Sequence, residues 1–180
     1  MSRGGSTSRF PEERDGMTDT PTSAPASDRE LVLSRVIDVP RHKLYRAWTE
    51  PELIKTWFTP PPYVTIRVEI DLRPGGTSLI VMRGPDRKEM PNRGVYLEVV
   101  PNERLVFTDA YVRAWEPSPK PFMTVTLTFE EEGGPGSGRT LYTARVVHWT
   151  VEDCEAHENM GFHHGWDMAT DQLAALAATL

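Results

Sequence analysis

The stretch from Thr150 to Leu180 is the feature that most constrains how this chain can fold. Six apolar residues in it recur at spacings of three and four, which at about 100° per residue places them on one narrow helical face. They are Phe162, Trp166, Ala169, Leu173, Leu176 and Leu180. We therefore predict a long C-terminal helix that buries one face against the rest of the protein.

The beginning of this helix is predicted from its capping residues. Thr150 followed by Asp153 is typical of a helix N-terminus, where side-chain oxygens accept hydrogen bonds from free backbone N–H groups. Continued toward Thr150, the apolar face meets Glu155, Glu158 and Asn159. Either the first turns run into solvent or bend away at Gly161, or a cavity with a polar rim lies beneath them.

The overall charge excludes several classes of partner. The chain of 180 residues has a formal net charge of −6 and contains no dense Lys/Arg run, so we expect neither nucleic acid nor an anionic membrane as a partner. Its one cysteine, Cys154, excludes an internal disulfide and a Cys-based zinc site and is consistent with a reducing compartment. No apolar run is long enough to span a bilayer.

The N-terminal segment differs in composition from the remainder. Residues 1–29 contain no Leu, Ile or Val, and are rich in Ser, Thr, Pro, Gly and charged residues. Such a segment cannot bury enough apolar surface to offset the entropy lost on ordering, so we predict a disordered tail at 1–29 and one domain at 30–180. The tail lacks the apolar core of a secretory signal, which favours a cytoplasmic location, and Met17 is an alternative start.

The domain itself is predicted to be α+β. A Leu/Val/Ile-rich strand at 31–39 is followed by two short helical patterns, the first containing Leu44 and Trp48 and the second Leu53 and Trp57. Six further strand candidates follow at 63–70, 77–83, 94–100, 104–112, 122–131 and 139–149, and apolar and polar residues alternate most clearly at 63–70 and 122–131. Consecutive antiparallel strands with one apolar face need a cover, and only the C-terminal helix has a long enough apolar face. The pattern indicates a curved sheet of about seven strands that grips this helix.

Several segments, in the same order, resemble one known family. They are SRVIDVPRHKLYRAWTEPELIKTWF, DLRPGG, VYLEVVPNERLVFTDA, MTVTLTFEEEGG and HENMGFHHGWDMATDQLAAL. From about residue 30 to 180 the chain resembles the bacterial branch of the heat-shock-ATPase-activator-like (AHSA-type) family, in the SRPBCC/START, pollen-allergen-like superfamily.

The resemblance implies a helix-grip fold with a cavity between sheet and long helix. It does not imply one function, because relatives include lipid carriers, cyclases and self-resistance proteins. The co-chaperone that names the family has a separate N-terminal domain that meets the chaperone. Since residues 1–30 cannot form such a domain, we do not expect a chaperone ATPase as a partner.

Aromatic residues are the main candidates for ligand contact. The resemblance places Trp48, Trp57 and Phe58 at the mouth and floor of the cavity, and Phe162 and Trp166 lie on the predicted face of the terminal helix. Aromatic walls with a few polar groups are typical of small-molecule pockets, although core packing explains the same residues.

One histidine is a candidate for acid–base chemistry. His148 ends the last predicted strand on the same face as Tyr142, so it would look into the cavity near Glu155 or Glu158. An imidazole beside a carboxylate can act as a general base, and the alternative is a single structural hydrogen bond. His157 and His163 are six residues apart on different helical faces, so we expect no metal site and no cofactor.

These observations favour a protein that binds a small hydrophobic or amphipathic molecule between the sheet and the C-terminal helix. Two alternatives remain. One is a cyclase- or hydrolase-like enzyme that uses the same cavity, and the other is a protein-interaction module of the co-chaperone type. The sequence leaves open a homodimer.

Overall fold

The computed structural model describes residues 27–180. Its elements are β1 (Glu30–Ile37), α1 (Arg41–Thr49), α2 (Pro51–Trp57), β2 (Val64–Ile70), β3 (Thr77–Arg83), β4 (Glu89–Val100), β5 (Arg104–Thr108), β6 (Tyr111–Arg113), β7 (Glu116–Pro117), β8 (Met123–Glu131), β9 (Thr140–His148), α3 (Val151–Asn159) and α4 (Phe162–Ala177). The predicted disordered tail lies almost wholly outside the described residues and stays a prediction. No helix within residues 27–180 is long and apolar enough to cross a membrane.

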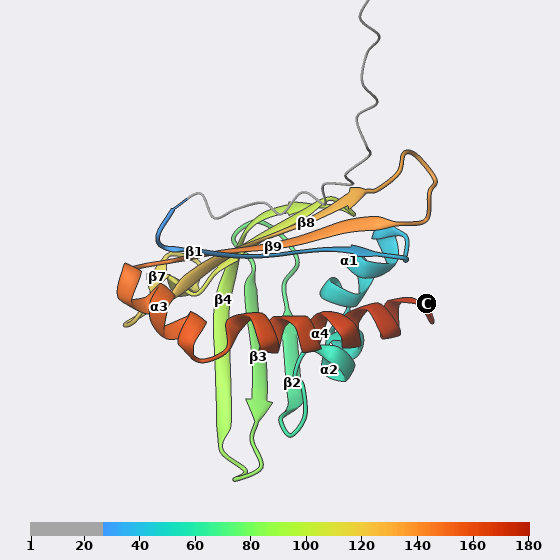
Figure 1. Cartoon of the computed structure of the whole chain (residues 1–180). Coiled ribbons are helices and arrows are strands. Elements are labelled where there is room, and N and C mark those ends of the chain that lie inside the picture. Colours follow the sequence, from blue (N-terminus) through green and yellow to red (C-terminus); the bar gives the residue numbers. More distant parts are fainter. Residues whose placement is uncertain (1–26) are drawn as a thin grey trace, which may run out of the picture.

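The main sheet is antiparallel and has seven strands in the order β1-β9-β8-β5-β4-β3-β2. Register shifts at Thr65/Arg67 and Tyr96/Glu98 mark irregularities that bend a sheet locally. Figure 1 shows α3 at one end of the sheet and α4 running back from it toward α1 and α2. The predicted α+β helix-grip fold is confirmed.

One predicted strand, 104–112, is divided in the structure. The chain leaves the sheet after Thr108, and β6 pairs with β7 in a separate two-stranded sheet. The turn is held by Asp109, whose Oδ1 accepts hydrogen bonds from the backbone N–H groups of Phe122 and Met123 at 2.9 and 3.0 Å. The prediction of one continuous strand was wrong. The carboxylate of Asp109, instead of a backbone carbonyl, accepts the hydrogen bonds of Phe122 and Met123, so the pairing of β5 with β8 ends at Thr108.

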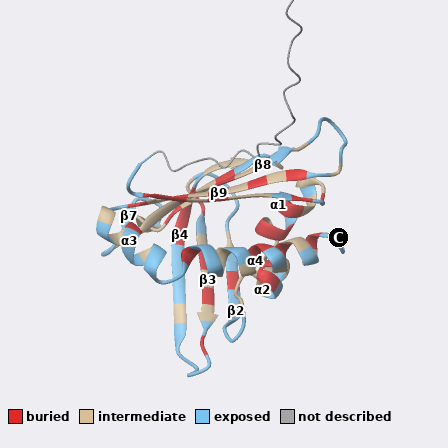
Figure 2. Cartoon of the chain, viewed as in Figure 1, coloured by how far each residue is buried: buried red, intermediate tan, exposed pale blue. Residues whose placement is uncertain are grey.

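The core lies between the β1, β9, β8 and β5 part of the sheet and the helices α1 and α4. Every second residue of β9 is buried, and Figure 2 shows the resulting bands of buried residues along the strands. Leu44 and Ala47 of α1 and Leu173 of α4 are fully buried in the same cluster. Of the predicted face of α4, Phe162 and Leu173 are buried, and Trp166, Ala169 and Leu176 are partly buried against the core.

The C-terminal segment forms two helices instead of one. Thr150 caps α3 as predicted, its Oγ1 accepting from the N–H of Asp153 at 3.0 Å. Gly161 has φ +94°, a left-handed conformation that other residues rarely adopt, and it ends α3 and begins α4. The bend at Gly161 was one of the two interpretations of the sequence.

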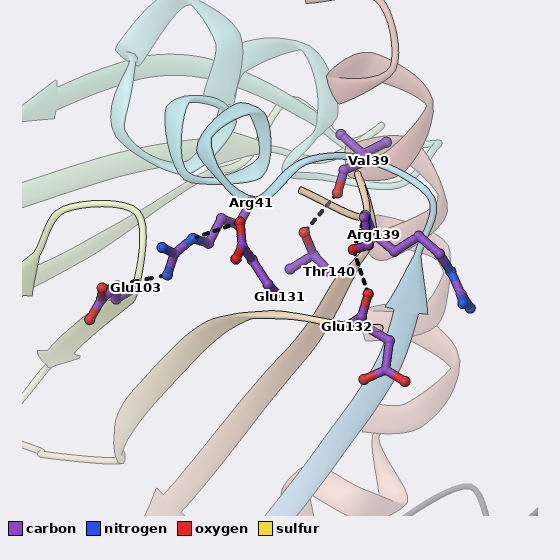
Figure 3. A network of polar contacts seen from close by, with 8 residues as sticks. Val39, Arg41, Glu103, Glu131, Glu132, Arg139 and Thr140 are labelled. Atoms are coloured by element: carbon purple, nitrogen blue, oxygen red, sulfur yellow. Dashed lines mark hydrogen bonds and ion pairs between the residues drawn. The ribbon is translucent and has the colours of Figure 1, made fainter. Parts of the chain in front are cut away.

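A polar network joins the start of α1 to the ends of neighbouring strands (Figure 3). Thr140 Oγ1 is buried and donates to the Val39 carbonyl at 2.7 Å, which fixes the corner between β1 and α1. Arg41 faces Glu103 and Glu131 at 3.5 and 3.9 Å. Exposed ion pairs contribute little to stability, so we assign the positioning role to the buried Thr140 contact.

Candidate functional site

A cavity of about 800 Å³ lies between the sheet and the helices α2 and α4. Its sheet side is formed by β3, β4, β5 and β8, and most of its lining side chains are apolar or aromatic. Since α4 packs against α1, α2 and β1, the cavity occupies the space over the other half of the sheet. A volume of this size is typical of a site for a small molecule.

Five of the nine residues that were predicted to contact a ligand line this cavity. They are Trp48, Trp57, Phe58, Tyr142 and Trp166. Phe162 is buried in the core beside Trp166, with ring centroids 5.4 Å apart, and does not line the cavity. Ligand contact by the five lining residues stays a prediction.

The aromatic wall is built by edge-to-face packing. The ring centroids of Trp48 and Trp57 are 4.7 Å apart with an interplanar angle of 72°, and Phe58 packs against both at 6.0 and 5.7 Å. Trp57 is 2% exposed and its Nε1 donates to the Ala47 carbonyl at 2.9 Å. Gln172 of α4 donates through Nε2 to the Trp57 carbonyl at 2.6 Å. These contacts hold α2 and α4 together along one side of the cavity.

An unpaired donor lies at the junction of this wall and the core. Trp48 is 6% exposed, and its Nε1 has no hydrogen-bond acceptor within residues 27–180. Burial raises the pKa of the Tyr142 hydroxyl far above its usual range, and the neighbouring Trp48 indole N–H opposes this shift. A buried donor without a partner costs about 1–3 kcal/mol, so the enclosed Trp48 N–H lowers the stability of the core.

Tyr96 and Phe107 line the cavity and were missed by the sequence analysis. They are paired in register on β4 and β5, with ring centroids 6.1 Å apart. Burial raises the pKa of Tyr96 to about 12, so its hydroxyl is a neutral group at physiological pH. The signal that could have found them is the alternation of the two strands, since inward-facing residues follow a period of two.

His148 does not pair with a carboxylate, so the predicted His148–Glu155 or His148–Glu158 arrangement was wrong. Both glutamates are exposed on α3, whereas His148 Nε2 lies 2.8 Å from Nδ1 of His157. The reason is the break at Gly161. The face of α4 does not continue into α3, whose inward residues are Cys154 and His157.

His157 is one of several titratable groups on the cavity wall that the sequence analysis did not assign to it, along with Arg93, Asp109 and Lys120. It is half-buried, lines the cavity and packs edge-on against Phe162 at 5.1 Å. Within residues 27–180, no three His, Cys, Asp or Glu side chains come together as a metal site would require. The two imidazoles therefore interact with each other and with aromatic rings.

The environment of His157 predicts a loss of stability in acid. Burial, together with the charge that His148 can carry, lowers the pKa of His157 from 6.5 to about 4. Between these values the unfolded chain binds the proton and the folded protein does not, so the free energy of unfolding falls as pH falls through this window. Allowing for partial exposure, we expect a loss of about 1 kcal/mol near pH 5, seen as a melting temperature lowered by about 2–4 °C relative to neutral pH.

His157→Asn isolates this contribution, because all carboxylates titrate alike in the two proteins. The variant should lose less stability than the wild type between neutral pH and about pH 5. Equal losses in the two proteins would show that His157 does not bind its proton more weakly in the folded state.

Comparison with known proteins places the chain in one family. The model of the family described as "Activator of Hsp90 ATPase homolog 1-like protein" matches residues 38–178, and the chain belongs to this family. A solved structure from Nitrosomonas europaea is 37% identical, with a TM-score of 0.80, and the match covers 86% of this chain and 97% of that one. The resemblance on which we based the fold is thereby confirmed.

More distant structures share the architecture. A protein from Chromobacterium violaceum is 26% identical with a TM-score of 0.63, and covers 84% of this chain and 98% of its own. One from Mycobacterium smegmatis, at 24% identity and a TM-score of 0.69, covers 83% of this chain and 90% of its own and supports the fold alone. None of the curated proteins matches this sequence.

Proposed function

We propose that this protein binds a small hydrophobic or amphipathic molecule in the cavity between the sheet and α4. The observation that carries the proposal is a mostly apolar cavity of about 800 Å³ with aromatic walls and a few polar groups. Burial of apolar surface supplies the affinity in such a site, and the polar groups select the ligand's orientation.

The family name refers to activation of a chaperone ATPase, whereas it is the cavity of this chain that supports binding of a small molecule.

A cavity-filling substitution tests the proposal. Ala169 of α4 lines the cavity, so Ala169→Phe should occupy part of the volume and weaken binding of a hydrophobic fluorescent dye, anilinonaphthalene sulfonate, by about tenfold or more. The matched control is Ala175→Phe, which places the same ring on the exposed side of the same helix.

The dye should bind the control variant and the wild-type protein with affinities that agree within about twofold, an energy difference below ~0.5 kcal/mol. Thermal melts of both variants verify that they are folded. If Ala169→Phe and Ala175→Phe change dye binding equally, or neither changes it, the cavity is not the binding site and the proposal is overturned. Native mass spectrometry of the freshly purified protein would then identify any small molecule that co-purifies with it.

A further inference from the structure

Two histidines lie side by side where β9 passes into α3. His148 is 1% exposed, and its Nε2 lies 2.8 Å from Nδ1 of His157. Phe122 contacts both imidazoles, with ring centroids 5.3 Å from His148 and 5.4 Å from His157. The pair is therefore held by aromatic packing on two sides, and only His157 reaches the cavity.

The position of the hydrogens in this pair follows from one backbone contact. His148 Nδ1 lies 3.1 Å from the carbonyl oxygen of Arg29, which can only accept a hydrogen bond. Nδ1 of His148 therefore carries the hydrogen, and in the neutral ring Nε2 of His148 carries the lone pair. With both rings neutral, the 2.8 Å contact is a hydrogen bond only if Nδ1 of His157 donates.

The hydrogen on Nδ1 of His157 determines the state of Nε2 on the opposite side of the ring. A neutral imidazole has one donor and one acceptor, so a ring that donates through Nδ1 has an unprotonated Nε2. The hydrogen bonds of the two rings within residues 27–180 run to each other and to the Arg29 carbonyl, not to a carboxylate that would favour a charged ring. The depressed pKa of His157 agrees with a neutral ring at physiological pH.

We propose that Nε2 of His157 is a hydrogen-bond acceptor that selects the ligand, and that it receives the hydrogen of a hydroxyl group on an otherwise apolar molecule. This inference rests on the proposed function. His148 and the Arg29 carbonyl act as positioning groups, because they hold His157 in the tautomer that accepts. An ether or ketone of the same shape has no hydrogen to offer this nitrogen, so it gains nothing there.

The first test measures the tautomer directly in the full chain without a ligand. The ring nitrogen chemical shifts of His157, measured by NMR at neutral pH, should show a protonated Nδ1 and an unprotonated Nε2. A hydrogen on Nε2 instead would overturn the inference. This measurement needs no substitution and does not depend on whether the cavity binds a ligand.

The second test compares two probes that differ by one hydrogen-bond donor. Naphthol and its methyl ether, methoxynaphthalene, have similar apolar surfaces, but only naphthol can donate. We expect the wild-type protein to bind naphthol about three- to tenfold more tightly, as one added hydrogen bond allows. Naphthol, but not the ether, should also shift the Nε2 signal of His157.

Two variants complete the comparison. His157→Phe keeps an aromatic ring against Phe122 and removes both nitrogens, so the two probes should bind with nearly equal affinity. His164→Phe, an exposed position on α4 outside the cavity, is the matched control and should keep the wild-type preference. If His157→Phe does not fold, the wild-type probe pair and the Nε2 shift still decide the question.

The outcomes separate this inference from the proposed function. If both probes bind the wild-type protein equally and neither shifts Nε2, the cavity binds apolar molecules but His157 does not select them, and this inference is overturned. If neither probe binds, the proposed function fails and the inference fails with it.

Discussion

Phe129→Ala should lower the free energy of unfolding by about 3–5 kcal/mol, because a large aromatic side chain is removed from a core that cannot fully close around the space. Phe129 is 1% exposed in β8 and contacts the rings of Tyr45 and Tyr142 at 6.0 and 5.8 Å. Its ring thus joins α1 to β9 across the sheet. Urea denaturation should show the loss as a lower midpoint with little change in slope.

The neighbouring residue provides the control. Thr128 points to the opposite face of β8, where it borders a second groove lined by side chains such as Thr126 and Thr143, so Thr128→Ala should cost no more than about 1 kcal/mol. Comparable losses at the two positions would contradict the assignment of the apolar core to one face of β8.

The fold could be predicted because most elements follow a single period. In β8 apolar residues alternate with polar ones, and in α4 they recur at helical spacing, so each pattern identifies the buried face by itself. The N-terminal half of β4 could not be predicted in this way. Residues 89–93 have no alternation and include Pro91, and they form a strand because β3 pairs with them.

The candidate site was predicted only in part, for a physical reason. Trp48, Trp57 and Trp166 are large apolar residues, and such residues line a cavity as readily as they fill a core, so their types and spacing were informative. The role of His157 depends on the phase of α3 relative to α4, that is, on which face of α3 turns inward when α4 is packed against the sheet. That phase is reset by the left-handed Gly161, and a sequence with one glycine at this point is compatible with either a straight or a broken helix.

Trp57→Ala should destabilise the protein by about 3–5 kcal/mol, which makes it unsuitable as a simple test of ligand contact even though Trp57 lines the cavity. Its indole is almost fully buried, packs against Trp48 at 4.7 Å and donates to the Ala47 carbonyl at 2.9 Å. The variant loses both the packing and the hydrogen bond between α1 and α2. Thermal or urea unfolding without any ligand measures this loss.

Trp57→Phe divides the two contributions. It keeps an aromatic ring against Trp48 but removes the N–H, so the Ala47 carbonyl loses its donor and the free energy of unfolding should fall by about 1–3 kcal/mol.

Phe58→Ala, on the same wall but only half-buried, should cost less stability than Trp57→Ala and weaken binding of the hydrophobic dye more clearly. A Trp57→Ala protein with an unchanged unfolding midpoint and weaker dye binding would reverse these roles. In that case the Trp57 indole would contribute no net packing energy to the folded protein, and other groups would hold α1 against α2. The aromatic wall would then contribute mainly to ligand binding.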